Sequence, residues 1–549
     1  MSTVPDATAP DVTVTVIVYN DAERLPRAVA SVRAQTHRAL EIVIADDHST
    51  DATPEVARAL AAKDDRIRYL RLERNSGGCS APRNRSVETA RAPYLMFLDS
   101  DDELPPDACA LLLAAHRERD VDFAMGAVER VRVDTGTTST WMASLFTERR
   151  TVAGIEAEPR LLFEPLSTNK MYRKDFLDRH ALRFPEGVHY EDQLFSAQAY
   201  TLARAFTVVT EPVYRWYIEP YAAGDAATIS NRRHLISNVR DRLAIARMID
   251  AFLAEHASPA LREEKDYKFL SHDLRLYAGD LPHRSLGWIE EFAAEVLPYL
   301  DGLSERALPR LGRAERVVVQ LLREGRHEDA RTAARDLAHG LAPRQVVRDA
   351  GGRTYWGDRV PASATARREL DLSELALADC PFPAARLRHE VLRAEPAGGA
   401  ALALRVRSHD PGRRLPLAPL LARLHVSPAG RRTTVSFRTD PVRPGVYEGE
   451  VVLDLGGGSL PAQGFAGVRH PVVELGDPAH RGTSHTGVLL APVDLPPFAL
   501  GRAGRHRVTV EAEGRGAGRL QLSWAPVGLT AALGPFAQRT ARTLRSLTP

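Results

Sequence analysis

The chain has 549 residues, enough for several domains, and its 44% hydrophobic and 26% charged residues are typical of a globular protein. Its 73 basic and 71 acidic residues leave a net charge of +2, so no overall positive field argues for a nucleic-acid partner. Three widely spaced cysteines fit a reducing compartment better than a disulfide framework. Because we find neither a signal peptide nor a long apolar run, we expect a cytoplasmic protein.

The N-terminal part of the chain alternates short apolar strands with amphipathic helices. Residues 1–11 are expected to form a disordered leader. Strands are expected at 12–19, 41–45, 67–72 and 94–98, and helices at 25–35, at 56–61 and in a segment ending at 90. This β-α-β order with short connections predicts a doubly wound, mostly parallel sheet, which we assign to a domain at residues 12–230.

The pattern changes twice in the rest of the chain. Apolar residues repeat at helical spacing in LAIARMIDAFLAEH and AERVVVQLLREG, which predicts a helical linker at 231–350. Alternating stretches such as TTVSFRT and YEGEVVLDL, separated by turns rich in Gly and Pro, predict an antiparallel β-sandwich at 351–527. The last residues, 528–549, form an amphipathic tail. We weigh peripheral membrane contact for this tail against packing on its own domain, which is commoner.

Acidic residues follow the apolar strand in YLMFLDSDDEL, residues 94–104. Ligands of open α/β sheets bind beyond the carboxyl ends of the strands, which is where Asp99 and Asp101 fall. Two carboxylates at positions i and i+2 of a turn can face one Mg²⁺ or Mn²⁺ ion, since these cations favour oxygen ligands. The alternative is a solvated turn that leads into an acidic helix start.

Five motifs in the first 230 residues resemble those of the inverting family 2 glycosyltransferases of the GT-A fold. They are VIVYND at 16–21, ADDHSTD at 45–51, NSGG and PRN within 75–84, FLDSDD at 97–102 and YEDQLF at 190–195. The likeness is greatest to the wall teichoic acid enzymes that add N-acetylglucosamine to poly(ribitol phosphate). It implies a GT-A catalytic domain with a Rossmann-like, mostly parallel sheet, followed by a helical linker and an oligomer-forming β region.

The resemblance also implies a nucleotide-sugar donor, most simply a UDP-sugar, and a Mn²⁺ or Mg²⁺ cofactor held by Asp101 and Asp99. It makes Asp192 the general base that takes the proton of the acceptor hydroxyl, with Glu191 orienting it. The residues expected to bind the nucleotide-sugar are Tyr19, Asn20, Asp46, Asp47, Asn75, Gly77, Arg83, Asp99, Ser100 and Lys170.

The acceptor is expected to be a glycan or a polyol phosphate of a cell-surface polymer or its precursor. The stretch EPYAAGDAATIS at 219–230 lacks the basic, histidine-containing loop of the teichoic acid enzymes, so the acceptor stays open. The β region serves either oligomerisation, which the resemblance favours, or glycan binding. An inactive glycan-binding or assembly protein is the alternative to an enzyme, and the presence of Asp99, Asp101 and Asp192 argues against it.

Overall fold

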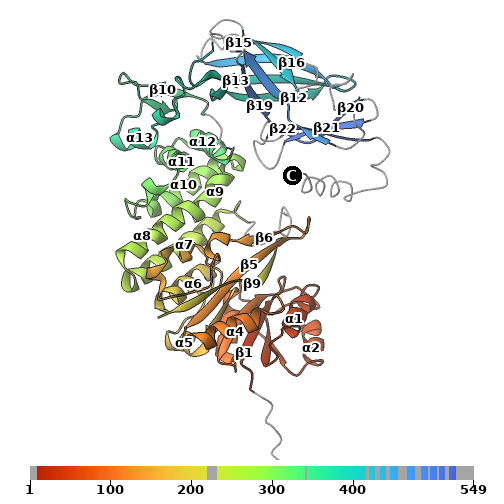
Figure 1. Cartoon of the computed structure of the whole chain (residues 1–549), viewed down its shortest axis with the longest axis vertical. Coiled ribbons are helices and arrows are strands. Elements are labelled where there is room, and N and C mark those ends of the chain that lie inside the picture. The colour runs from red at the N-terminus through yellow and green to blue at the C-terminus, as the bar shows by residue number, and fades with distance from the viewer. Residues whose placement is uncertain are drawn as a thin grey trace, which may run out of the picture. The chain divides into compact units, whose positions relative to one another are not determined.

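The computed structural model divides into two compact units (Figure 1). Unit 1 consists of residues 1–273 and 294–310, and unit 2 consists of residues 274–293 and 311–549. The structure describes residues 9–218, 232–339, 343–415, 420–426, 433–439, 445–455, 467–476, 484–491, 495–503, 506–512 and 519–526. Most of the expected leader, the acceptor-loop stretch at 219–230 and the tail at 528–549 lie outside these residues.

Unit 1 is built on a nine-stranded sheet with the order β3-β2-β1-β4-β8-β5-β9-β7, and β6 pairs with β5. The strands are β1 (Val12–Val18), β2 (Leu40–Asp46), β3 (Ile67–Arg71), β4 (Tyr94–Asp99), β5 (Phe123–Arg132), β6 (Thr138–Trp141), β7 (Arg150–Val152), β8 (Lys170–Arg173) and β9 (Phe206–Ile218). Neighbouring strands in β3-β2-β1-β4 are parallel, and β8 runs antiparallel between β4 and β5. The mostly parallel α/β sheet predicted from the sequence is confirmed.

Helices cover both faces of this sheet, which explains why β1 and β2 are buried along their whole length. The helices are α1 (Leu25–Arg33), α2 (Thr53–Ala61), α3 (Ser80–Thr89), α4 (Ala108–Glu118), α5 (Lys174–Arg179) and α6 (Glu191–Leu202). In β4, Met96 and Leu98 pack in one core with α1 and α4, whereas Leu95 and Phe97 pack in a second core with α3, α5 and α6. All seven residues of β1 are buried.

The helices that follow the sheet are shared between the units. Helices α7 (Ile236–His256) and α8 (Pro259–Lys268) belong to unit 1, as does most of a π-helical segment at Phe269–Leu274. Unit 2 contains α9 (Arg275–Asp280), α11 (Arg313–Arg323), α12 (His327–His339) and α13 (Ala364–Glu369), and α10 (Leu286–Leu300) contributes residues to both units. The division therefore differs from the expected limit at residue 230. Among the described residues, no helix combines the length and apolar character needed to cross a membrane.

Unit 2 carries the β region. A hairpin of β10 (Val346–Arg348) and β11 (Thr354–Trp356) precedes it. A closed barrel contains β12 (Arg388–Pro396), β13 (Ala401–His409), β16 (Val446–Asp454), β15 (Thr433–Thr439), β14 (Leu420–His425), β18 (Val472–Gly476) and β19 (Ser484–Leu490). A four-stranded sheet contains β17 (Gly467–Arg469), β22 (Leu520–Pro526), β21 (His506–Ala512) and β20 (Phe498–Ala503). The predicted antiparallel β architecture is confirmed, although its larger part closes into a barrel through the parallel pair β12–β19.

Candidate active site

The candidate site lies at the carboxyl ends of β1, β2 and β4. In the register of the sheet, Val18 at the end of β1 lies opposite Asp46 of β2, and Ile17 lies opposite Asp99 of β4. The polar turns that follow these strands therefore start at the same edge, where open α/β sheets bind ligands. The sequence motifs expected to bind the nucleotide come together at this edge.

The turn after β1 presents one aromatic ring and fixes the neighbouring loop. The side chain of Tyr19 is 49% exposed and therefore accessible to a planar ligand. Asn20 adopts a left-handed backbone conformation, and its Oδ1 accepts a hydrogen bond of 2.8 Å from the backbone N–H of Thr50. The backbone N–H of Asn20 donates to Ser49 Oγ at 2.9 Å. Asn20 thus holds the loop after β2 in place.

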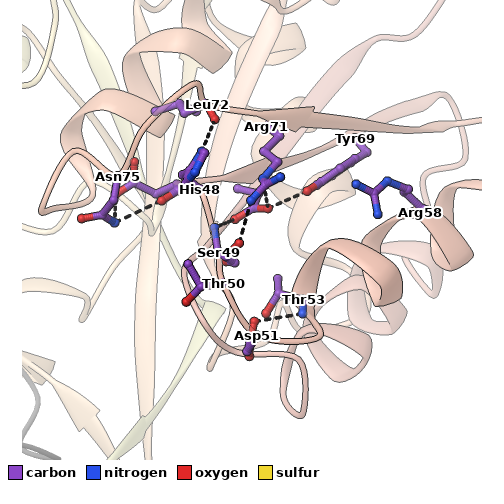
Figure 2. A network of polar contacts seen from close by, with 12 residues as sticks. His48, Ser49, Thr50, Asp51, Thr53, Arg58, Tyr69, Arg71, Leu72 and Asn75 are labelled. Carbon is purple, nitrogen blue, oxygen red and sulfur yellow. Dashed lines mark hydrogen bonds and ion pairs between the residues drawn. The ribbon is translucent and has the colours of Figure 1, made fainter.

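Asp46 is fully buried and serves as an internal anchor of the β2–β3 edge. Its partners Ser49, Tyr69 and Arg71 are labelled in Figure 2. Its carboxylate accepts hydrogen bonds from the hydroxyl of Tyr69 and from the backbone N–H of Ser49. The guanidinium of Arg71 lies 3.7 Å from the same carboxylate and donates to the carbonyl oxygen of Ser49 at 2.8 Å. The observed contacts of Asp46 are therefore internal, and the nucleotide contact expected for it stays a prediction.

Asp47 ties the glycine loop to the end of β2. Asn75 Nδ2 donates to Asp47 Oδ2 at 2.9 Å, and the backbone N–H of Ser76 donates to Asp47 Oδ1 at 3.0 Å. Burial raises the pKa of Asp47, although the bonds from Ser76 oppose this shift. Gly77 has a φ of +81°, a conformation that would strain any L side chain. Asp47, Asn75 and Gly77 therefore shape the loop that the sequence assigned to the nucleotide.

The residues after β4 differ in accessibility. Asp99 is 33% exposed, and Asp101 is similarly accessible. Ser100 Oγ donates to Asp21 Oδ2 at 2.6 Å, which links this turn to the turn after β1. Asp102 is buried, where it accepts hydrogen bonds from the hydroxyl of Tyr214 at 2.7 Å and from a backbone N–H of β9 at 2.8 Å. Asp99 and Asp101 are thus the carboxylates of this turn that a ligand can reach.

Asp99 and Asp101 suit a divalent cation whose remaining ligands come mainly from the substrate of the protein. Within the described ranges, no group of three or more His, Cys, Asp or Glu side chains is arranged to hold a metal ion. Burial, together with the charge of Asp99, raises the pKa of Asp101 to about 6. A divalent cation would relieve this repulsion and would complete its shell with water and phosphate oxygens, as Mg²⁺ commonly does.

Arg83 of α3 connects the strand-end turn to the start of α6. Its guanidinium is 2% exposed, and Nη2 donates to Asp99 Oδ1 at 2.9 Å. Nη1 donates to Glu191 Oε1 at 2.8 Å and to Asp192 Oδ1 at 2.7 Å. The sequence predicted that Arg83 binds the nucleotide-sugar, and the structure places this side chain among three carboxylates. Its observed contacts position those carboxylates.

The predicted base, Asp192, is held through one of its two oxygens. Ser167 Oγ donates to Asp192 Oδ1 at 3.0 Å, and Arg83 donates to the same oxygen. These two residues therefore leave Oδ2 for a substrate proton. Burial, reinforced by the charge of Asp192, raises the pKa of Glu191 to about 7, and Arg83 opposes this shift.

The helices after the sheet brace the segment that carries this base. Tyr190 precedes α6 in a left-handed conformation, and the guanidinium of Arg242 lies 3.7 Å from its ring centroid. The hydroxyl of Tyr190 donates to Asn238 Oδ1 at 2.8 Å. Lys268 Nζ donates to Gln193 Oε1 at 2.6 Å. Residues from α7 and α8 therefore fix both sides of Glu191 and Asp192.

Lys170 does not join the residues at the strand ends. Its side chain is completely buried in unit 1, where the ammonium group bonds to Glu164, to the carbonyl oxygen of Leu166 and to Asn169. Burial lowers its pKa, whereas Glu164 opposes the shift. These internal contacts account for the position of Lys170, and its expected contact with the nucleotide-sugar stays a prediction.

Sequence reasoning missed several residues of the site. Arg24 directly precedes α1, and its Nη1 lies 3.7 Å from Asp101 Oδ2. Arg27 belongs to α1 and lies over the ring of Tyr217. Ser167 and Arg242 were also missed. Arg24 and Arg27 are three residues apart at the start of a helix that follows a binding strand. This spacing could have indicated both residues. No sequence signal pointed to Ser167 or Arg242, because their partners are remote along the chain.

Comparison with known proteins agrees with the motifs. Residues 13–181 match the family model described as glycosyl transferase family 2. The chain is 35% identical over 214 residues to the putative glycosyltransferase EpsH of Bacillus subtilis, which covers 38% of this chain and 61% of that protein. It is 30% identical over 210 residues to the poly(ribitol-phosphate) beta-N-acetylglucosaminyltransferase TarP of Staphylococcus aureus, which covers 38% of this chain and 62% of that protein. The chain thus spans about three fifths of the length of these relatives.

Solved structures of S. aureus TarS share the fold. The structure of TarS 1-349 in complex with UDP-GlcNAc matches with a TM-score of 0.50 and 21% identity, over 64% of this chain and 97% of that one. The longer TarS structure matches with a TM-score of 0.50 and 16% identity, over 95% of this chain and 87% of that one. The predicted resemblance is confirmed, since residues 13–181 match the glycosyl transferase family 2 model.

Proposed function

We propose that the chain is an inverting, metal-dependent glycosyltransferase that moves a sugar from a nucleotide-sugar to a hydroxyl of a cell-surface polymer or its precursor. The observation that carries the proposal is the single guanidinium of Arg83, which joins Asp99 of the strand-end turn to Glu191 and Asp192. This contact brings the expected donor-binding and base motifs into one cluster. Inverting transfer needs both at once, since the base must act on the acceptor beside the bound donor.

Asp192 is the proposed general base. Its Oδ2 takes the proton of the acceptor hydroxyl while Arg83 and Ser167 hold Oδ1 and keep the side chain in one orientation. Glu191 supports this orientation through the shared guanidinium. The accessible ring of Tyr19 is the proposed stacking partner of the base of the nucleotide.

Asp101 and Asp99 are the residues that would hold Mn²⁺ or Mg²⁺, and the cation would offset the charge of the departing nucleoside diphosphate. Arg24, beside Asp101, is placed to meet a phosphate oxygen of the same ligand. We take a UDP-sugar such as UDP-GlcNAc as the donor, supported by the fold shared with TarS, which was solved with that compound.

A teichoic-acid-like polyol phosphate or a polysaccharide is the proposed acceptor, supported by the match to TarP. We also propose that the protein is cytoplasmic and self-associates through its β region. A further proposal is that residues 528–549 make peripheral contact with the membrane. Sedimentation of the full chain with and without anionic vesicles tests both associations.

The test is a donor screen on the full chain. Nucleotide sugars are incubated with Mn²⁺ or Mg²⁺, and released nucleoside diphosphate is measured with and without chelator. Chelator-sensitive turnover of one donor is expected, and Asp192→Asn should lower kcat by about 10² to 10⁴ while donor affinity is kept. Asp175→Asn, an exposed acid on α5, is the matched control and should not change kcat. Wild-type transfer by Asp192→Asn would remove Asp192 as the base, and silence across all donors would favour an inactive glycan-binding protein.

A further inference from the structure

A buried ion pair is connected to the proposed base in unit 1. Lys170 of β8 and Glu164 are both completely buried, and the ammonium group of Lys170 contacts a carboxylate oxygen of Glu164. Taking both charges out of water is costly, and replacing such a pair by well-packed uncharged side chains is often neutral for stability or stabilising. The stability of the fold therefore does not by itself explain why the pair is present.

The pair encloses a short irregular segment, residues 164–169, that leads into β8. The segment contains no helix and no strand, yet four of its six residues are buried and all four are polar: Glu164, Ser167, Thr168 and Asn169. Buried backbone without a helix or a strand ladder must find its hydrogen-bond partners among side chains. The position of this segment therefore depends on the side chains that bind it.

Lys170 supplies several of these contacts. Besides its contact with Glu164, its ammonium group donates to the carbonyl oxygen of Leu166 and to Asn169 Oδ1. Glu164 Oε1 accepts a hydrogen bond of 3.3 Å from the backbone N–H of Leu166, so both members of the pair bind the same residue. Ser196 Oγ of α6 donates to the carbonyl oxygen of Leu166 at 3.3 Å. The segment is thus tied to the helix that carries the base.

Ser167 is the residue through which the segment contacts the base. It is completely buried, and its Oγ donates to Asp192 Oδ1 at 3.0 Å. Lys170 binds the residue before Ser167 and the second residue after it, so the backbone is held on both sides of this hydroxyl. Burial lowers the pKa of Lys170, whereas the charges of Glu164 and Asp192 oppose the shift. The pair therefore acts on the base through the segment and also senses its charge.

We propose that this buried ion pair is a positioning element of the transfer reaction, because it holds Ser167 in place against the base, Asp192. The proposal rests on the transferase function proposed above, since it concerns the base of that reaction. Arg83 binds the same oxygen of Asp192 from α3, so losing the pair loosens the base without releasing it. Lys170 then works through Ser167, whereas the sequence predicted a direct contact with the donor.

Steady-state kinetics of the full chain test the proposal with the double variant Lys170→Met, Glu164→Gln. This change removes both charges together and keeps the size of both side chains, so no lone charge is left buried. The double variant should lower kcat about fivefold, the effect of losing one hydrogen bond to the base, with the KM for the donor unchanged. Lys174→Met with Asp178→Asn removes an exposed pair of the same kind on α5 and is the matched control, with the kcat of wild type.

Ser167→Ala shows whether the pair acts through Ser167. If it does, both changes remove the same contact, and adding Ser167→Ala to the double variant should lower kcat by less than about twofold further. Should the double variant fail to fold, Glu164→Gln alone carries the same test, because it keeps the size of the side chain and the oxygen that accepts from Leu166.

Each other kinetic outcome overturns the proposal. Effects on kcat that multiply would show that the pair does not act through Ser167. A higher KM for the donor with an unchanged kcat would return Lys170 to the donor contact predicted from the sequence. Wild-type kcat and KM in the double variant would remove the pair from the reaction.

A crystal structure of the double variant gives a readout that needs no turnover. Ser167 Oγ should lie beyond hydrogen-bond distance of Asp192 Oδ1, while Arg83 keeps its bond to that oxygen. A retained bond between Ser167 and Asp192 would overturn the proposal even in an active enzyme. Loss of this bond in a protein whose wild type turns over no donor would contradict the transferase function and leave the link between the pair and Asp192 standing.

Discussion

The two units bury ionic clusters of opposite composition. In unit 1, one guanidinium, Arg83, is shared by the three carboxylates of Asp99, Glu191 and Asp192. In unit 2, one carboxylate, Glu390, is shared by three guanidiniums. The first cluster has an excess of negative charge and suits a metal cation and a base. The second gathers three arginine side chains around one carboxylate.

The two clusters also differ in whether their charged groups can change protonation state. Carboxylates in a negative cluster can take up protons, and burial raises the pKa of Glu191 to about 7 in this way. Arginines in a positive cluster keep their charge at any pH at which proteins fold. Protonation can therefore adjust the charge of the carboxylates in the first cluster but not that of the arginines in the second.

The largest effect is expected for Glu390→Gln. Removing this carboxylate takes away the partner that Arg335, Arg344 and Arg388 share and should lower the free energy of unfolding by about 4–5 kcal/mol. Denaturant unfolding measures the change. Glu395→Gln, an exposed position on the same strand paired with Arg393, is the control and should change stability by less than about 1 kcal/mol. Equal stability of the two variants would contradict the importance of the cluster.

The next largest effect is expected for Arg83→Met, which should lower the free energy of unfolding by about 3–4 kcal/mol at neutral pH. Its three orphaned carboxylates can protonate, so the loss should shrink as the pH is lowered. Unfolding curves at several pH values measure this trend. Arg85→Met on the same helix removes only an exposed pair with Glu88 and serves as control. A pH-independent loss in Arg83→Met would break the comparison.

In a third cluster, Lys268 and Arg242 contact the carboxylate of Asp273. This cluster provides a test with an effect of intermediate size. Burial would raise the pKa of Asp273, but Lys268 and Arg242 outweigh it and lower the pKa to about 2. Because the folded pKa lies below the unfolded one, Asp273 stabilises the fold above about pH 4 and loses this contribution as the pH falls through 2. The shift corresponds to about 2 kcal/mol. Unfolding free energies of wild type and Asp273→Asn should therefore converge by that amount between pH 5 and pH 2, and a constant difference would contradict the shift.

The smallest effect is expected for Ser167→Ala. Loss of one hydrogen bond to Asp192 should lower kcat about fivefold, equivalent to about 1 kcal/mol, because Arg83 still holds the same oxygen. Steady-state kinetics should show this in kcat, with the KM for the donor unchanged and the pH profile of kcat shifted. A change in the donor KM alone would show that Ser167 serves binding and does not position the base.

Local sequence determined the sheet and the place of the site. The run VTVTVIV forms a wholly buried β1, and the abrupt change from YLMFL to aspartates ends β4 at the sheet edge where ligands bind. The family motifs were visible because each is contiguous. These features depend on neighbouring residues, so the chain order alone was sufficient to predict them.

Only the tertiary structure decided which charges meet. Asp46 and Lys170 were predicted at the donor, but both are fully buried with internal partners. Arg83 lies 108 and 109 residues from two of its partners, and Arg335 lies far along the chain from Glu390. A charged side chain carries no sequence signal for a remote partner, because long-range packing selects that partner by excluding water around both. The composition of each cluster follows from that packing.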